Sequence, residues 1–141
     1  MLKYTIQITR DTTGFMAVCR DMPKFLTAGE TEDEIIALAP EAFEMAVECY
    51  MDENIPVPLP SGDVMEAGCV IVLSVTLSAK IELYNTLLAS HVSKSELARR
   101  MGIPNQNIKK LLSPSTKSRL DTMESAFAAL GKRLDISVSA V

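Results

Sequence analysis

The sequence predicts an α+β fold in two parts: a sheet-and-helix unit at residues 1–78 and an all-helical unit at residues 79–141. Apolar residues alternate at every second position near the start of the chain, whereas helical spacing dominates its second half. Between these patterns, the segment 54–62 carries proline at three alternating positions, which keeps it extended and ends any helix before it. Charge divides at the same place, with 4 basic and 11 acidic residues in 1–62 but 10 basic and 5 acidic residues in 80–141.

In the first unit, three strands are expected at residues 2–9, 15–20 and 25–28. The first alternates apolar and polar side chains, which is typical of a strand with one buried face, and a turn at residues 11–14 joins it to the second as a hairpin. Later, the run 69–77 is apolar and rich in β-branched residues, so it predicts a well-buried fourth strand.

A helix is expected over residues 31–52. Thr31 and Glu34 have the capping-box spacing that satisfies free N–H groups in the first turn. Pro40 removes one helical hydrogen bond and should bend the axis. The predicted core face holds Ile36, Ala39, Phe43, Val47 and Tyr50. The predicted acidic face holds Glu34, Glu41, Glu44, Glu48 and Asp52.

The second unit predicts four helices, the first at residues 79–90. Ser93 caps the second helix, Gly102 ends it in left-handed geometry, and Pro104 starts the third. Ser118 and Asp121 are expected to cap the fourth helix, which closes at a glycine. Residues 132–141 form a tail with a weak strand-like alternation.

Two short helices joined through Gly102 are typical of a helix-turn-helix, whose second helix enters the major groove of DNA. Gln106 could pair with adenine, and the neighbouring lysines with guanine or phosphate. Free N–H groups at the start of the preceding helix favour a phosphate. The alternative is an ordinary helical cluster with solvated lysines. The candidate DNA-binding residues are Ser93, Lys94, Ser95, Asn105, Gln106, Lys109 and Lys110.

Composition narrows the class of protein. The chain of 141 residues has a net charge of −4, ordinary globular composition and no apolar run of bilayer-spanning length. Its three cysteines lack the spacing of a zinc site or a disulfide framework, so we expect a cytoplasmic protein without metal or cofactor. An acidic unit beside a basic unit predicts two different partners, one cationic and one anionic.

Several motifs resemble the HicB antitoxin family of type II HicAB toxin–antitoxin systems. The first unit carries Tyr4-Thr5-Ile6, Gly14-Phe15-Met16-Ala17, Asp21-Met22-Pro23, the Gly29-Glu30-Thr31 step before the helix, and the closing Pro58-Leu59-Pro60-Ser61. Residues 79–138 resemble the Cro-type helix-turn-helix that follows this domain in one branch of the family. Cys19-Arg20 and Pro40 depart from the family's usual residues.

The resemblance implies a truncated ribonuclease-H-like first domain, with three antiparallel strands, a helix and a parallel fourth strand. It implies a bacterial antitoxin that binds a HicA-type toxin, a small basic ribonuclease, and keeps it from cutting messenger RNA. The second domain would bind operator DNA as a dimer or tetramer and repress the shared operon. Candidate toxin-binding residues are Asp21, Pro23, Glu30, Asp33, Glu41, Glu44 and Glu48.

Two other functions stay open from the residues alone. One is a transcriptional regulator whose first unit senses a small ligand, with no protein partner. The other is a metal-dependent nuclease, which needs clustered carboxylates that the first strand lacks. His91 is the only histidine and has no evident catalytic partner, so we expect no enzyme activity.

Overall fold

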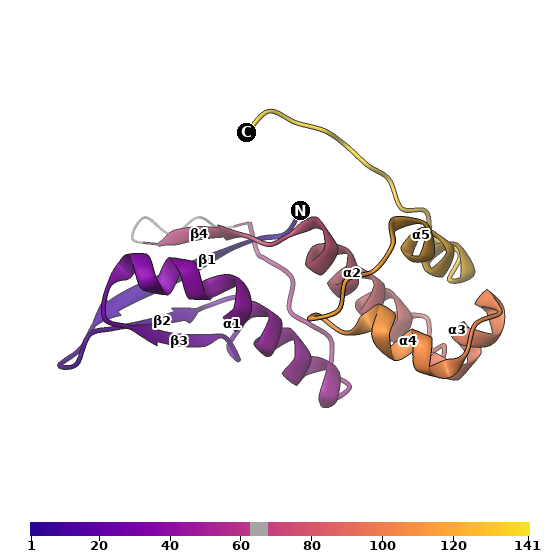
Figure 1. Cartoon of the computed structure of the whole chain (residues 1–141), viewed down its shortest axis with the longest axis horizontal. Helices are drawn as coiled ribbons and strands as arrows, with labels where there is room; N and C mark the ends of the chain where they lie inside the picture. The colour runs from indigo at the N-terminus through magenta and orange to yellow at the C-terminus, as the bar shows by residue number, and fades with distance from the viewer. Residues whose placement is uncertain (63–67) are drawn as a thin grey trace.

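The computed structural model describes residues 1–62 and 68–141 and confirms the α+β class, with a four-stranded antiparallel sheet and five helices in these ranges (Figure 1). The sheet order is β3-β2-β1-β4. The strands are β1 (Lys3–Arg10), β2 (Phe15–Cys19), β3 (Leu26–Gly29) and β4 (Cys69–Val72). The helices are α1 (Glu32–Asp52), α2 (Val75–Ala89), α3 (Lys94–Met101), α4 (Asn105–Leu112) and α5 (Leu120–Ala129).

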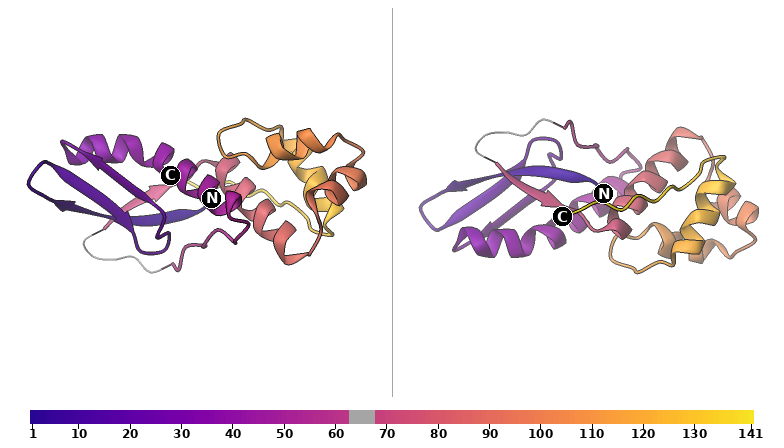
Figure 2. Two further views of the ribbon diagram at one scale, coloured as in Figure 1. Left: turned by 90° about the horizontal axis from the view of Figure 1, so that it is seen from below. Right: turned by 90° about the horizontal axis from the view of Figure 1, so that it is seen from above.

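Helix α1 lies along one face of the sheet (Figures 1 and 2). Thr31 caps it as predicted, because its side chain accepts a hydrogen bond from the Glu34 N–H. Phe43 stacks on Phe25 with ring centroids 4.2 Å apart and also contacts Tyr4 from β1. The predicted core position of Ile36 is wrong: its side chain is 41% exposed and Ile35 is buried instead.

The expected parallel direction of the fourth strand is wrong, because β4 pairs antiparallel with β1. The cause is the proline-rich segment. After α1 the segment runs back along the sheet, where the Tyr4 hydroxyl donates to the Pro58 carbonyl at 2.6 Å and Ser61 donates to the Asp21 carboxylate at 3.0 Å. The chain therefore approaches β4 from the opposite end of the sheet and enters it in the reverse direction (Figure 1).

The predicted strand over residues 69–77 is also too long. β4 ends at Val72, and α2 begins at Val75 with Ser74 as its N-cap, whose side chain accepts from the Leu77 N–H. Leu73 and Leu77 are buried, so the apolar run serves two elements in succession.

The helical unit follows the predicted order. Gly102 ends α3 with φ of 68°, a left-handed conformation that glycine adopts without a Cβ clash. The predicted cap of the last helix is wrong: Arg119 occupies the N-cap of α5, with no side-chain hydrogen bond, and not Ser118. The tail after α5 forms no regular element.

Helix α2 connects the two halves of the molecule. The Asn85 side chain both accepts from the Val57 N–H and donates to the Val57 carbonyl, each at 2.9 Å. The Tyr84 hydroxyl contacts the Tyr50 and Ile55 carbonyls at 3.2 and 2.8 Å. These contacts hold the proline-rich segment against α2, and buried side chains from both halves form one continuous core.

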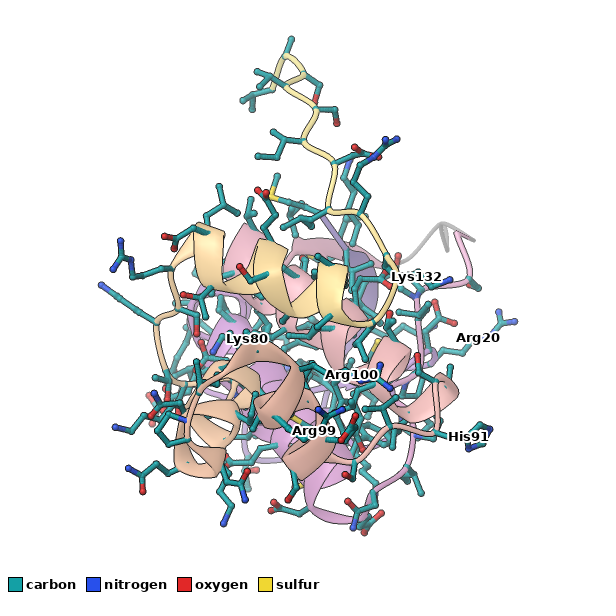
Figure 3. All side chains as sticks on the ribbon, turned by 90° about the vertical axis from the view of Figure 1, so that its right-hand side faces the viewer. Arg20, Lys80, His91, Arg99, Arg100 and Lys132 are labelled. Atoms are coloured by element: carbon teal, nitrogen blue, oxygen red, sulfur yellow. The ribbon has the colours of Figure 1, made fainter. Side chains whose placement is uncertain are left out.

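Lys80 is a buried lysine of α2 that contacts the end of α4. Its Nζ donates to the Lys110 carbonyl at 3.2 Å and to the Ser113 carbonyl at 2.7 Å, and Figure 3 shows it inside the helical unit. Carbonyls at a helix C-terminus carry partial negative charge and lack partners within the helix. Burial lowers the pKa of Lys80 to about 8. This side chain therefore anchors α4 to α2.

We predict that Asn85→Ala lowers the free energy of unfolding by about 1–3 kcal/mol, because both backbone groups of Val57 lose their partner. Asn107→Ala, at an exposed position of α4, is the control and should change stability by less than about 0.5 kcal/mol. Urea denaturation measures both. Equal small effects would contradict the role given to Asn85.

We also predict a pH effect from Lys80. Between pH 8 and 10.5 its amine is mostly neutral in the folded protein but mostly protonated in the unfolded chain, so Lys80 by itself makes the free energy of unfolding rise with pH in this window, against the raised pKa values of Cys19, Tyr4 and Tyr84, which make it fall. Lys80→Met should remove this rise, whereas Lys117→Met, at an exposed lysine, should keep it. Urea unfolding at a series of pH values tests this, and identical pH profiles for wild type and Lys80→Met would refute it.

Candidate nucleic-acid interface and acidic surface

Helices α3 and α4 form a compact pair joined by the short connection from Gly102 to Pro104. The Ile103 N–H donates to the Ala98 carbonyl at 3.0 Å, which fixes how the chain leaves α3. The inner faces are apolar and buried, and α2 and α5 pack against the pair (Figure 2). The buried residues of the pair are Leu97, Ala98, Ile108, Leu111 and Leu112.

The candidate DNA-binding residues of α4 lie on its exposed side. Asn105, Gln106, Lys109 and Lys110 are all exposed, while Ile108, Leu111 and Leu112 of the same helix are buried in the core. The inner face of this helix is packed against the core, and its outer face carries an amide and two cations. Such a face can contact the base edges and the phosphates of a duplex.

The first turn of α3 lies beside this helix. The Asn105 amide donates to the Ser95 hydroxyl at 3.3 Å, so the starts of α3 and α4 are close together. Lys94 is exposed next to them. The Ser93 hydroxyl accepts from the Glu96 N–H at 3.0 Å, so it acts as the helix cap that the sequence predicted. The structure thus brings all seven candidate residues onto one helix pair.

Two arginines that contribute to the basic charge of this half are held by a carboxylate. Glu96 pairs with Arg99 and Arg100, and these ion pairs lower the pKa of Glu96 to about 2. Arg100 also donates to the Ala129 carbonyl at 3.1 Å, which joins α3 to α5 (Figure 3). Arg100 therefore braces α3 against α5, and Arg99 is paired within α3, so the exposed lysines carry the positive charge that has no ion-pair partner in this helix pair.

The sequence analysis did not select Lys117 and Arg119, which lie between α4 and α5, as candidate DNA-binding residues. Both are exposed, and Arg119 lies 3.5 Å from Asp121 at the surface. Their basic charge is visible in the sequence, but both residues lie outside a predicted helix, and the candidates were chosen from helical spacing.

A second surface follows the outer side of α1. Glu41 and Glu48 are exposed there and Glu44 is half-buried. Met45, which is 63% exposed, lies among these acids, and Leu38, which is 38% exposed, lies three residues before Glu41; the sequence analysis selected neither residue. The outer side of α1 is therefore both acidic and apolar, a combination suited to a basic protein partner.

The other predicted toxin-binding residues lie at the two ends of this helix. Asp21 and Pro23 follow β2, where Lys24 pairs with Glu53 at 2.9 Å, next to the end of α1. Asp21 is partly buried and accepts from Ser61, so it holds the proline-rich segment. Glu30 and Asp33 are exposed near the start of α1. The structure does not gather these residues into one cluster.

Among residues 1–62 and 68–141, no three side chains of His, Cys, Asp or Glu gather closely enough to hold a metal ion. His91 is exposed between α2 and α3 and has a φ of 54°. The cysteines are unpaired, and burial raises the pKa of Cys19. No helix in the described part of the chain has the length and hydropathy to cross a bilayer.

The chain matches known proteins over nearly its whole length. Residues 3–82 match the family described as HicB-like antitoxin of bacterial toxin–antitoxin systems. Antitoxin HicB 2 of Photorhabdus laumondii is 32% identical, covering 96% of this chain and 95% of the relative. Antitoxin HicB of Pseudomonas fluorescens is 32% identical over 99% of this chain and 96% of the relative. Antitoxin HicB of Escherichia coli K12 is 32% identical over 96% and 98%. The chain therefore belongs to the HicB-like antitoxin family.

Proposed function

We propose that this protein is an antitoxin that neutralises a HicA-type mRNA-cleaving toxin through residues 1–78 and represses its own operon through residues 79–141. The observation that carries the proposal is the placement of an acidic, partly apolar helix surface on one half and an exposed amide-and-lysine helix on the other. We infer a regulatory, non-enzymatic role in the bacterial cytoplasm. Because β4 is antiparallel, only β1–β3 and α1 support the ribonuclease-H-like fold that the resemblance implies for residues 1–78.

On the DNA side, α4 would act as the recognition helix of a helix-turn-helix. Gln106 would pair with a base edge, and Lys109 and Lys110 would reach bases or phosphates. The first turn of α3, with Lys94 and Ser95, would position the pair on a phosphate. Lys80 supports this function by holding the end of α4 in place.

On the toxin side, the acidic residues of α1 would speed encounter with a basic ribonuclease by long-range attraction. Met45 and Leu38 would supply apolar contact, which contributes more to the affinity of the formed complex. A toxin surface that binds RNA phosphates must be cationic, so an anionic helix can occupy it in place of RNA.

Co-expression tests the proposal as a whole. The protein should restore growth to cells that express the small basic protein of the neighbouring reading frame, and the purified protein should shift a fragment of its own promoter. We further propose that toxin binding changes the oligomeric state of the antitoxin and hence its affinity for DNA. A gel-shift titration in which DNA binding is unchanged at every ratio of toxin to antitoxin would contradict this proposal.

We predict that Gln106→Ala relaxes sequence preference, with a loss of about 1–3 kcal/mol on the preferred operator and little change on random DNA. Lys110→Ala should weaken binding to both DNAs to a similar degree, as expected for a phosphate contact, and should reduce the dependence on salt. Fluorescence anisotropy at several salt concentrations separates the two. A selective loss in Lys110→Ala would instead assign this lysine to base reading.

We also predict that Glu48→Lys slows association with the toxin roughly tenfold at low ionic strength, because it reverses a charge on the docking surface. Glu124→Lys makes the same change on α5, away from that surface, and should leave the association rate unchanged. Stopped-flow or surface-plasmon measurements compare the two. The same slowing in both variants would show that only overall charge matters.

A further inference from the structure

The connection between α4 and α5, residues 113–119, is a second basic surface beside the proposed recognition helix and is here called the basic loop. Lys117 and Arg119 are its only charged residues, and both are exposed. Ser115 is also exposed and adds a hydroxyl donor. In the described part of the chain, Lys117 forms no ion pair. Its charge is therefore available to a partner.

The basic loop is held at both of its ends. At its start, Lys80 donates to the Ser113 carbonyl at 2.7 Å, and Pro114 is buried against the helical core. At its end, Arg119 is the N-cap of α5, a helix whose inner side is buried. Side chains on a connection that is anchored in this way keep a defined position relative to α4.

The length of α4 places the basic loop at the border of a DNA groove. With eight residues α4 is about 12 Å long, and the major groove of B-DNA is about 12 Å wide. The N-terminal residues of a recognition helix reach the base edges, so the chain that leaves its C-terminal end emerges beside a phosphate strand. Figure 2 shows the loop continuing from α4 along the edge of the helical unit before it reaches α5.

We propose that the basic loop binds the phosphate backbone of DNA at the C-terminal end of α4, while the first turn of α3 binds it near the N-terminal end. Lys117 and Arg119 each hold a phosphate in this arrangement. The proposal rests on the proposed function, because it adds a second phosphate-binding surface to the helix pair. Since phosphate contacts carry no base information, the loop increases affinity for every sequence and fixes the register of α4 in the groove.

The ion pair between Arg119 and Asp121 does not oppose this role. The two side chains are 84% and 72% exposed and lie 3.5 Å apart. Exposed pairs of this kind contribute little to stability, so a phosphate can replace the carboxylate. A loop of seven residues with two cations and no acid attracts a polyanion, whereas it repels a basic toxin. DNA is therefore the partner that the charge of the loop favours.

The salt dependence of DNA binding by the full-length protein tests the proposal. Lys117→Gln and Arg119→Gln should each weaken binding to the operator and to random DNA by the same factor, roughly fivefold per bound chain at about 0.15 M salt, because fewer counterions are released. Each should also reduce the slope of log K against log salt by about 0.9 per chain, and the double variant should lose about twice as much. Fluorescence anisotropy at several salt concentrations measures these slopes.

Lys132→Gln is the matched control. It removes the same charge from the helical half, but beyond the other end of α5, about 15 Å away along a helix of ten residues (Figure 3). Its slope should equal that of the wild type, and circular dichroism should show that all variants fold. Phosphate-ethylation interference on the operator is a second measurement. Ethyl groups at the phosphates held by the loop should weaken binding of the wild type but not of the double variant.

Three results would overturn the proposal: a wild-type slope in both loop variants, an equal loss of slope in Lys132→Gln, or a loss confined to the operator, which would assign the loop to base reading. In each case the wild type still binds its operator, and a response to Gln106→Ala would leave the proposed function standing. A wild type that binds no DNA would refute the DNA side of the proposed function together with this proposal.

Discussion

The arrangement of the whole molecule depends on how the proline-rich segment 54–62 is held. Asn85 bonds both backbone groups of Val57, Tyr84 contacts the carbonyls of Tyr50 and Ile55, and Tyr4 contacts Pro58. Because proline leaves few backbone donors and keeps the chain extended, side chains must supply these bonds. The segment therefore sets the direction of β4 and joins the sheet to α2.

The contact between the proline-rich segment and α2 has a consequence for function. A flexible tether between two binding units would let each act alone, but α2 packs on the proline-rich segment and on α4 and α5 at the same time. Lys80 extends the connection to the end of α4. If the outer side of α1 binds the toxin and the pair α3–α4 binds DNA, as we propose, the toxin is placed at a fixed distance and angle from the DNA, so one partner can affect binding of the other through steric crowding or through assembly.

Features set by local chemistry could be predicted from the sequence. Thr31, Ser93 and Gly102 act as predicted because capping involves only a few neighbouring residues. The antiparallel direction of β4 could not be predicted, because it depends on contacts between residues such as Tyr4 and Pro58 that lie 54 positions apart. Ile36 and Ile35 are equally apolar, and only the packing on the sheet selects Ile35 for the core. The burial of Lys80 could not be predicted, since its acceptors are backbone carbonyls that no sequence pattern marks.

The central claim is that one half of this chain holds a basic toxin and the other half holds DNA. Hydrogen–deuterium exchange of the full-length protein tests it most directly, with the neighbouring toxin and with promoter DNA in separate samples. The account predicts that toxin slows exchange in α1 and that DNA slows exchange at residues 93–110. Protection by both partners in the same half, or by neither partner in either half, would contradict it.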